Sequence, residues 1–347
     1  LVGSEMCIRD RLNASHMGMY TDSPYESKST YQSMSCGFEM TPDAESGLYR
    51  VSHVYKDGPA DREWVDVDEG DYVLSIDGKS LKPPDNPWRI LNHTVNDRVE
   101  VVVSADPKGE NKRTSTIKLI GLYDVRRLRY AEWVDANRKK VDALSNGRIG
   151  YVHIPAMSGR SLERFKKELT EFRLKEGLVI DVRFNGGGNI DQELIDILER
   201  RQFGNWRRRG STPHRRPWNG FFGRKVVLIN ERSFSDAEVF PRAFKDLRLG
   251  KLVGVPTGGG VIGTGSYRLI DGSVMRTPHV GVYLMDGTNL ENWGVRPDVY
   301  VENTPEDELA GRDPQLERAV SELLKDLDGG KKASEKDGEK KAPEKSK

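Results

Sequence analysis

Short apolar runs alternate with amphipathic segments throughout the second half of this chain of 347 residues. Four runs have the length and composition of buried strands: 148–154, 177–182, 226–229 and 251–255. Three segments carry apolar residues at helical spacing: 162–174, 190–201 and 316–327. Strands that alternate with helices form a largely parallel sheet covered by those helices. The pattern therefore predicts an α/β core, with a further helix over 123–146 and a β-rich stretch over 266–284.

Residues 36 to about 120 show a different pattern, in which short strands are separated by Gly, Pro and Asp turns. Asp77-Gly78 is a hairpin signal, and 87–91 is predicted to form one short helix. This order resembles a PDZ domain, with Gly37 and Phe38 where that family has its carboxylate-binding loop. Such a domain adds an extended peptide to a sheet edge, although a PDZ-like spacer that binds nothing also fits.

The composition gives no support to several classes of function. Charged residues make up 31% of the chain and the net charge is only +1, so no nucleic-acid partner is indicated. The two cysteines, Cys7 and Cys36, have neither disulfide-framework nor zinc-ligand spacing. No apolar run approaches the roughly 18 residues that span a bilayer. We therefore predict no metal, no cofactor and no membrane segment.

Both ends of the chain differ from the rest. Residues 1–11 lack the apolar core of a signal peptide and fit nothing downstream, so we expect them to be foreign to the natural protein. A natural N-terminus could be missing before the motif that follows. Residues 328–347 are rich in Lys, Glu, Gly and Pro and almost free of apolar side chains, which predicts a disordered, solvated tail.

Ser235 stands where a predicted strand turns into a predicted helix. The apolar run 226–229 precedes it, and acidic residues follow in what reads as a first helical turn, 236–240. A hydroxyl at such a turn projects from the backbone beside free N–H groups and a partial positive charge. This placement suits a nucleophile, although a serine there can also be a simple N-cap.

Three glycines, 186–188, follow the buried run 177–182 and precede a predicted helix. They let backbone N–H groups approach a ligand closely. Phosphate binding is not supported, because neither the GxxxxGK[ST] nor the GxGxxG spacing is present. A tight turn remains one interpretation. The other is an oxyanion hole in which Gly187 and Gly188 act with the N–H of Asp236, an arrangement that can supply several kcal/mol.

The two motifs together resemble the tail-specific, or C-terminal-processing, serine proteases. The sequence DVRFNGGG at 181–188 is followed about 50 residues later by SFSDAE at 233–238. Most members of that clan pair the serine with a lysine in a Gly-x-x-Thr-x-Gly-Lys-Gly turn. Here the matching turn, 254–260, has Gly260 in the lysine position. Another base must therefore activate the hydroxyl.

Two further segments resemble the tricorn branch of these proteases. In that branch a Ser-His pair matching Ser15-His16 supplies the catalytic histidine, and a glutamate matching Glu291 completes a Ser-His-Ser-Glu tetrad. The resemblance implies that Ser235 is the nucleophile and His16 the general base, with Ser15 and Glu291 orienting the imidazole. Histidine suits this role because its pKa lies near neutrality.

Several neighbouring residues offer alternatives. Asp286 and Asp298 lie close to Glu291 in the sequence and could take its place. The other histidines carry no matching motif, and His153 is predicted to be a core residue. The basic insert 205–216 allows three interpretations: a solvated loop, a nucleic-acid contact, or arginines that hold peptide carboxylates.

The resemblance implies an α/β fold: a crotonase/ClpP-like α/β protease core with an inserted mostly-β PDZ-like domain. The expected parts are a non-native leader (1–11), a leading catalytic segment (12–35), the PDZ-like domain (36–122), a helical linker and serine protease core (123–327) and the tail (328–347). It also implies peptide or unfolded-protein substrates, a homo-oligomer (a hexamer by analogy) and a cytoplasmic location, with the periplasm left open. The family's N-terminal β-propellers are not in this sequence. The alternatives are a non-catalytic peptide-binding scaffold and a crotonase-like acyl-CoA enzyme.

Overall fold

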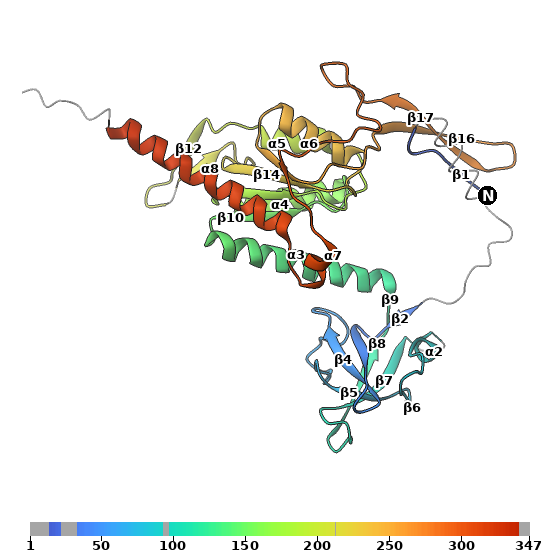
Figure 1. Cartoon of the computed structure of the whole chain (residues 1–347). Helices are drawn as coiled ribbons and strands as arrows, with labels where there is room; N and C mark the ends of the chain where they lie inside the picture. Colours follow the sequence, from blue (N-terminus) through green and yellow to red (C-terminus); the bar gives the residue numbers. More distant parts are fainter. Residues whose placement is uncertain (1–13, 22–32, 93–96, 212, 340–347) are drawn as a thin grey trace, which may run out of the picture. The chain divides into compact units, whose positions relative to one another are not determined.

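The computed structural model describes residues 14–21, 33–92, 97–211 and 213–339. The chain divides into two compact units, one covering Tyr25–Ala136 and one made of two stretches, Leu1–Pro24 and Asn137–Lys347. The helix α3 (Leu122–Ser145) belongs partly to each. The predicted leader, 1–11, lies outside the described residues. Figure 1 labels most of the elements.

The first unit is mostly β, as predicted. Its main sheet is antiparallel, in the order β3 (Phe38–Asp43), β4 (Leu48–Val54), β5 (Tyr72–Ile76), β7 (Arg98–Ser104) and β8 (Lys112–Lys118). Three short elements accompany it: β6 (Lys79–Ser80) beside β5, a pair formed by β2 (Met34–Ser35) and β9 (Ile120–Gly121), and the helix α2 (Trp88–Leu91). Asp77 and Gly78 both have positive φ, as the predicted hairpin turn requires.

Alternate residues of these strands fill the core of the first unit. Val99, Val101 and Val103 of β7 are buried, whereas Arg98 and Glu100, which alternate with the first two, are exposed. Cys36 lies in the same core as a free thiol, and burial raises its pKa to about 12. A buried thiol with so high a pKa stays protonated and unreactive.

The second unit contains the predicted parallel sheet. Its order is β10 (Ile149–His153), β11 (Gly177–Asp181), β14 (Arg224–Ile229), β15 (Lys251–Gly254) and β18 (Val299–Tyr300). The helices of this unit are α4 (Gly159–Phe172), α5 (Asp191–Leu198), α6 (Asp236–Asp246), α7 (Pro305–Leu309) and α8 (Pro314–Glu339). Every residue of β11 is buried, because helices cover both faces of a parallel sheet.

A small antiparallel sheet joins the leading segment to this core. The strand β1 (Gly18–Tyr20) pairs with β17 (Val274–Gly281), which pairs in turn with β16 (Ile262–Arg268). Figure 1 shows the three strands side by side. Pairing of Gly18 with Arg276 places residues just before Gly18 next to the segments that follow β15. A second hairpin, β12 (Gly204–Trp206) and β13 (His214–Arg216), forms within the basic insert.

The structure departs from the sequence pattern at two helices. The helix α5 ends at Leu198, three residues before the end of the predicted segment 190–201. The helix α8 continues to Glu339, into the segment predicted to be a disordered tail. Lys, Glu and Ala have high helix propensity, and elongating an existing helix needs no new nucleus, so a polar segment can extend α8. Residues 340–347 lie outside the description.

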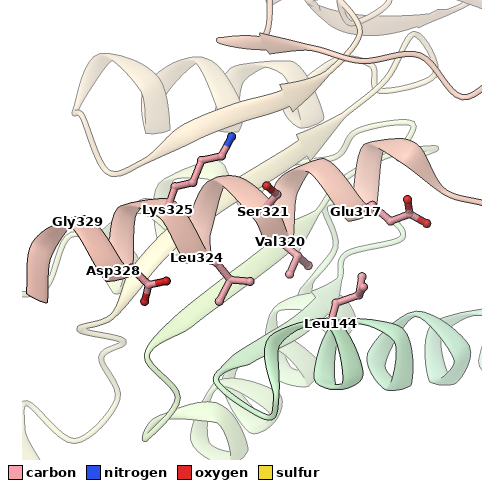
Figure 2. Close-up of a pocket in the computed structure, with 8 residues that line it drawn as sticks. All are labelled: Leu144, Glu317, Val320, Ser321, Leu324, Lys325, Asp328 and Gly329. Carbon is pink, nitrogen blue, oxygen red and sulfur yellow. The ribbon is translucent and has the colours of Figure 1, made fainter.

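A groove lies between the end of α3 and α8. Figure 2 shows Leu144 on α3 and Val320 and Leu324 on α8, with Glu317 and Lys325 beside them. The catalytic candidates do not line it. Across the described parts of the chain, no helix combines the length and apolar character needed to cross a membrane.

Candidate active site

Ser235 lies at a sharp turn between β14 and α6. Its φ is +56°, which is uncommon for a residue with a side chain and marks a strained backbone. Two hydrogen bonds tie this turn to the segment that follows β11: Phe234 N–H donates to Asn185 O (2.9 Å), and the Ser233 hydroxyl donates to Val182 O (2.9 Å). The strained turn at the carboxyl end of a central parallel strand is the setting of a nucleophilic serine.

The glycine turn packs directly against Ser235. A Cβ placed on Gly187 would lie 2.6 Å from the Ser235 Cβ and 2.8 Å from Phe234 O. A Cβ on Gly188 would lie 1.8 Å from Met157 O. Both glycines also have positive φ, +101° and +149°. The close approach and the backbone conformation each require glycine at these positions.

The predicted oxyanion donors differ in their availability. Gly187 N–H donates to the Asn185 side-chain oxygen at 2.9 Å. Within the described residues, no hydrogen bond engages the N–H of Gly188 or of Asp236. Gly188 and Asp236 thus have the free donors that a developing oxyanion needs, whereas Gly187 contributes its lack of a side chain.

Ser15, His16 and Glu291 form a connected hydrogen-bond network. Glu291 Oε1 accepts Ser15 N–H (2.5 Å), and Oε2 accepts the Ser15 hydroxyl (3.2 Å). Ser15 Oγ lies 2.6 Å from His16 Nδ1. Because the Ser15 hydroxyl proton is donated to Glu291, the hydroxyl oxygen accepts from Nδ1–H. That assignment leaves Nε2 of His16 unprotonated, as a general base requires.

The surroundings of His16 favour its neutral form. Burial lowers the pKa of His16 below its usual 6.5, and the positive charge of Arg276 lowers it further. The Glu291 carboxylate acts in the opposite direction but does not cancel these two effects. His16 is therefore uncharged at neutral pH and able to accept a proton.

Gly260 contacts both the Ser15–His16 segment and the turn that carries Ser235. Its carbonyl oxygen accepts Ser235 N–H at 2.9 Å. A Cβ placed on Gly260 would lie 3.4 Å from Ser15 Oγ and 3.6 Å from His16 Cε1. The structure thus gathers Ser235, Ser15, His16 and Glu291 around the backbone of Gly260. This glycine stands at the position where most tail-specific serine proteases have a lysine.

The alternatives to Glu291 make other contacts. Asp298 pairs with Lys245 and accepts Leu252 N–H. Asp286 is exposed and accepts the N–H of Thr288, two residues away. Glu291 is 5% exposed and also accepts Val261 N–H at 2.6 Å. The geometry therefore favours Glu291 as the acidic member of the network.

Other predicted residues lie outside this network. His153 is buried, as predicted, with Nε2 beside Arg183 O at 3.0 Å. In the PDZ-like unit, Gly37 N–H donates to the Ser35 hydroxyl at 3.0 Å, and Phe38 begins β3 with a buried side chain. The hydrogen bond from Gly37 N–H to Ser35 would have to break before Gly37 could bind a peptide carboxylate.

Two acidic residues near Ser235 were not predicted to have side-chain roles. Asp236 is buried and accepts Ile190 N–H (2.7 Å) and Asp191 N–H (3.2 Å), at the start of α5. Burial and the neighbouring Asp191 raise the pKa of Asp236 to about 7. Glu238 is fully buried and accepts Ser235 N–H at 3.1 Å. The spacing Ser-x-x-Glu, typical of a capping box, is the signal that could have identified it.

Among the residues that the structure describes, no group of three or more His, Cys, Asp or Glu side chains is arranged to hold an ion. The chemistry that the arrangement can perform uses an alcohol, an imidazole and backbone N–H donors.

Comparisons with known proteins agree with this geometry. The model described as Peptidase family S41 matches residues 148–301, and the model described as Tricorn protease PDZ domain matches residues 35–121. The chain is 38% identical over 266 residues to the Tricorn protease of Thermoplasma acidophilum, covering 75% of this chain and 24% of that protein. It is 36% identical over 294 residues to Tricorn protease homolog 1 of Streptomyces coelicolor, covering 82% of this chain and 27% of that protein.

A solved structure gives the same result. The crystal structure of the tricorn protease matches 90% of this chain and 31% of its own, with a TM-score of 0.80 and 33% identity. These matches confirm the predicted fold class, an α/β protease core with a PDZ-like domain. The chain spans about a quarter of the length of the two curated relatives named above.

Proposed function

Because the chain belongs to peptidase family S41, in its tricorn branch, we propose that it hydrolyses peptide bonds through an acyl-enzyme on Ser235. One observation supports this most strongly. The network Glu291–Ser15–His16 reaches the same glycine backbone, Gly260, that accepts the Ser235 N–H. The proposed base and the proposed nucleophile, which are far apart in the sequence, therefore both lie next to Gly260.

The proposed reaction follows from the placement of these groups. His16 Nε2 takes the Ser235 hydroxyl proton while Oγ bonds to the substrate carbonyl carbon. The N–H groups of Gly188 and Asp236 stabilise the resulting oxyanion. His16 then gives its proton to the leaving amine as the C–N bond breaks, which leaves the acyl-enzyme. Water, deprotonated by His16, releases the acid product and restores Ser235.

The wider properties are proposals by analogy with the tricorn branch. The substrates would be peptides or unfolded proteins, and the chain would assemble as a homo-oligomer, with a hexamer as the first expectation. A cytoplasmic location is the corresponding expectation. Sedimentation velocity tests the assembly, and cell fractionation tests the location.

A direct experiment tests the catalytic proposal. Hydrolysis of a fluorogenic peptide library is compared between the wild-type chain and Ser235→Ala, after circular dichroism has shown equal folding. We expect turnover by the wild type and a loss of at least 10³-fold in Ser235→Ala, within the range for removal of a catalytic serine. Turnover that survives in Ser235→Ala would place the chemistry elsewhere.

The match of residues 35–121 to a PDZ domain supports one alternative, a non-catalytic peptide-binding scaffold. This alternative predicts that the wild-type chain binds peptides with free C-termini and leaves them intact. Mass spectrometry of the bound peptide after prolonged incubation separates the two functions, because only an enzyme produces fragments.

A further inference from the structure

Glu238 is a carboxylate with no exposed surface at the centre of the proposed site. Its Oε1 accepts Ser235 N–H (3.1 Å) and Gly260 N–H (2.8 Å). Its Oε2 accepts Gly259 N–H (2.8 Å) and the Thr257 hydroxyl. The four donors come from only two places, the turn that carries Ser235 and the turn 257–260.

A buried carboxylate is costly unless hydrogen bonds compensate the lost hydration. Burial raises the pKa of Glu238, and the four hydrogen bonds act in the opposite direction by stabilising the ionised form. These hydrogen bonds also restrict geometry, because one rigid carboxylate plane fixes all four donors relative to one another.

The segment that carries Glu291 also holds the turn 257–260. Gly259 O accepts Asn292 N–H at 2.7 Å, and the Thr257 hydroxyl accepts Val295 N–H at 2.7 Å. Residue 261, next in the chain, donates its N–H to Glu291. Continuous contacts therefore lead from Ser235 through Glu238 and this turn to Glu291, which holds Ser15 and His16.

We propose that Glu238 is a positioning residue that keeps the Ser235 turn in register with the Ser15–His16 segment. The proposal rests on the proposed function and deepens it. Glu238 does not touch the reacting atoms. It acts through the backbone of Ser235 on one side and of Gly260 on the other, so that the nucleophile and its base approach the substrate together.

Glu238→Gln tests the proposal, because it keeps the size of the side chain but replaces one acceptor oxygen by an NH₂ group. The new NH₂ group then faces two N–H or O–H donors instead of accepting from them. Either the Ser235 turn or the turn 257–260 must therefore move. Glu168→Gln is the matched control, since Glu168 is also buried (6% exposed) but forms ion pairs with Arg164 of α4 and Arg138 of α3. Both variants and the wild type are labelled with a fluorophosphonate well below their unfolding temperatures.

Two quantities separate positioning from simple destabilisation: the labelling rate constant and the final labelled fraction. We expect Glu238→Gln to label about 10- to 100-fold more slowly and to lose a similar factor in kcat with little change in KM, because a misplacement of about 1 Å can cost 10²-fold. The labelled fraction should stay near that of the wild type. Glu168→Gln should keep the wild-type rate constant.

Three results would overturn the inference. A Glu238→Gln rate constant within twofold of the wild type would remove the positioning role. So would a lower labelled fraction with an unchanged rate constant, which indicates partial unfolding only. If Glu238→Gln does not fold, Thr257→Val replaces it, because it removes one donor to Oε2, and an unchanged rate there also contradicts the proposal. A folded wild type that is not labelled at all would instead reject the proposed function itself.

Discussion

Glu291 accepts two hydrogen bonds from Ser15, one from its N–H at 2.5 Å and one from its hydroxyl at 3.2 Å, although 276 positions separate the two residues. Both carboxylate oxygens are used, so the Ser15 backbone and side chain are fixed together. The hydroxyl can then accept only from His16 Nδ1, which determines the imidazole tautomer. The Glu291 carboxylate thus sets the tautomer of His16, the proposed base.

Glu291→Gln should therefore weaken catalysis without abolishing folding. A Gln side chain has one acceptor oxygen, so it cannot hold both groups of Ser15 and also Val261 N–H. We expect kcat to fall about 10- to 1,000-fold with KM nearly unchanged, because misorientation of His16 forfeits part of the roughly 10²–10⁴-fold that a general base contributes. Steady-state kinetics checks this, with Asp286→Asn as the control, because Asp286→Asn should keep its activity within twofold of the wild type. A large loss of kcat in Asp286→Asn together with a small loss in Glu291→Gln would assign the acidic role to Asp286.

Gly187→Ala should be strongly impaired, whereas Gly186→Ala should not. A methyl group on Gly187 would meet the Ser235 side chain and Phe234 O in a backbone with positive φ, but one on Gly186 meets no atom within 4 Å. We expect Gly187→Ala to lose at least 10²-fold in kcat/KM and about 1–3 kcal/mol of unfolding free energy. Kinetics and urea titration measure both. Equal behaviour of the two variants would rule out close packing of this turn on the nucleophile.

The pH dependence of kcat/KM should report His16. Burial and Arg276 lower the pKa of His16 below 6.5, so activity should rise with pH and reach half its plateau below pH 6.5. In Arg276→Gln one lowering influence is lost, and this midpoint should move upward. A protonated His16 is disfavoured in the folded state, so this group also makes the protein less stable as pH falls below 6.5. If the midpoint of the pH profile is the same in Arg276→Gln as in the wild type, this would argue against His16 as the titrating base.

Asp236 should make folding stability fall as pH rises. Burial and Asp191 raise its pKa from 3.8 to about 7 in the folded protein, so between these pH values the folded state binds the proton and the unfolded state does not. The folded state loses stability from this group across that window, by at most about 1.4 kcal/mol per pH unit, and no further above pH 7. Asp236→Asn cannot titrate. Its stability relative to the wild type, measured by urea titration, should increase from pH 4 to pH 7, and a constant difference would contradict the assigned shift.

The sequence predicted the parts of the site that are local. An apolar run, a serine and acidic residues are enough to place Ser235 at a strand–helix turn, because each signal lies within about ten residues. The glycine motif was equally local. Which of its N–H groups are free could not be predicted, because Gly187 N–H donates to the Asn185 side chain, a contact that spacing cannot show.

The assembly of the site depended on contacts that no local pattern contains. The strand β1 has three residues, too few for a periodic signal, and its partner β17 is far along the chain. Only the family resemblance suggested that Ser15 and His16 join Glu291. Glu238 appeared in the sequence as an ordinary helix-start residue, because its four donors come from turns that meet only in three dimensions.

The most direct test of the account is the identity of the labelled residue and its dependence on His16. The wild-type chain and His16→Gln are treated with a fluorophosphonate, and the modified peptide is identified by mass spectrometry. The account predicts a single adduct on Ser235 in the wild type and a labelling rate about 10²–10⁴-fold lower in His16→Gln, the range for removing a general base. An adduct on another residue, or a Ser235 adduct that forms equally fast without His16, would contradict it.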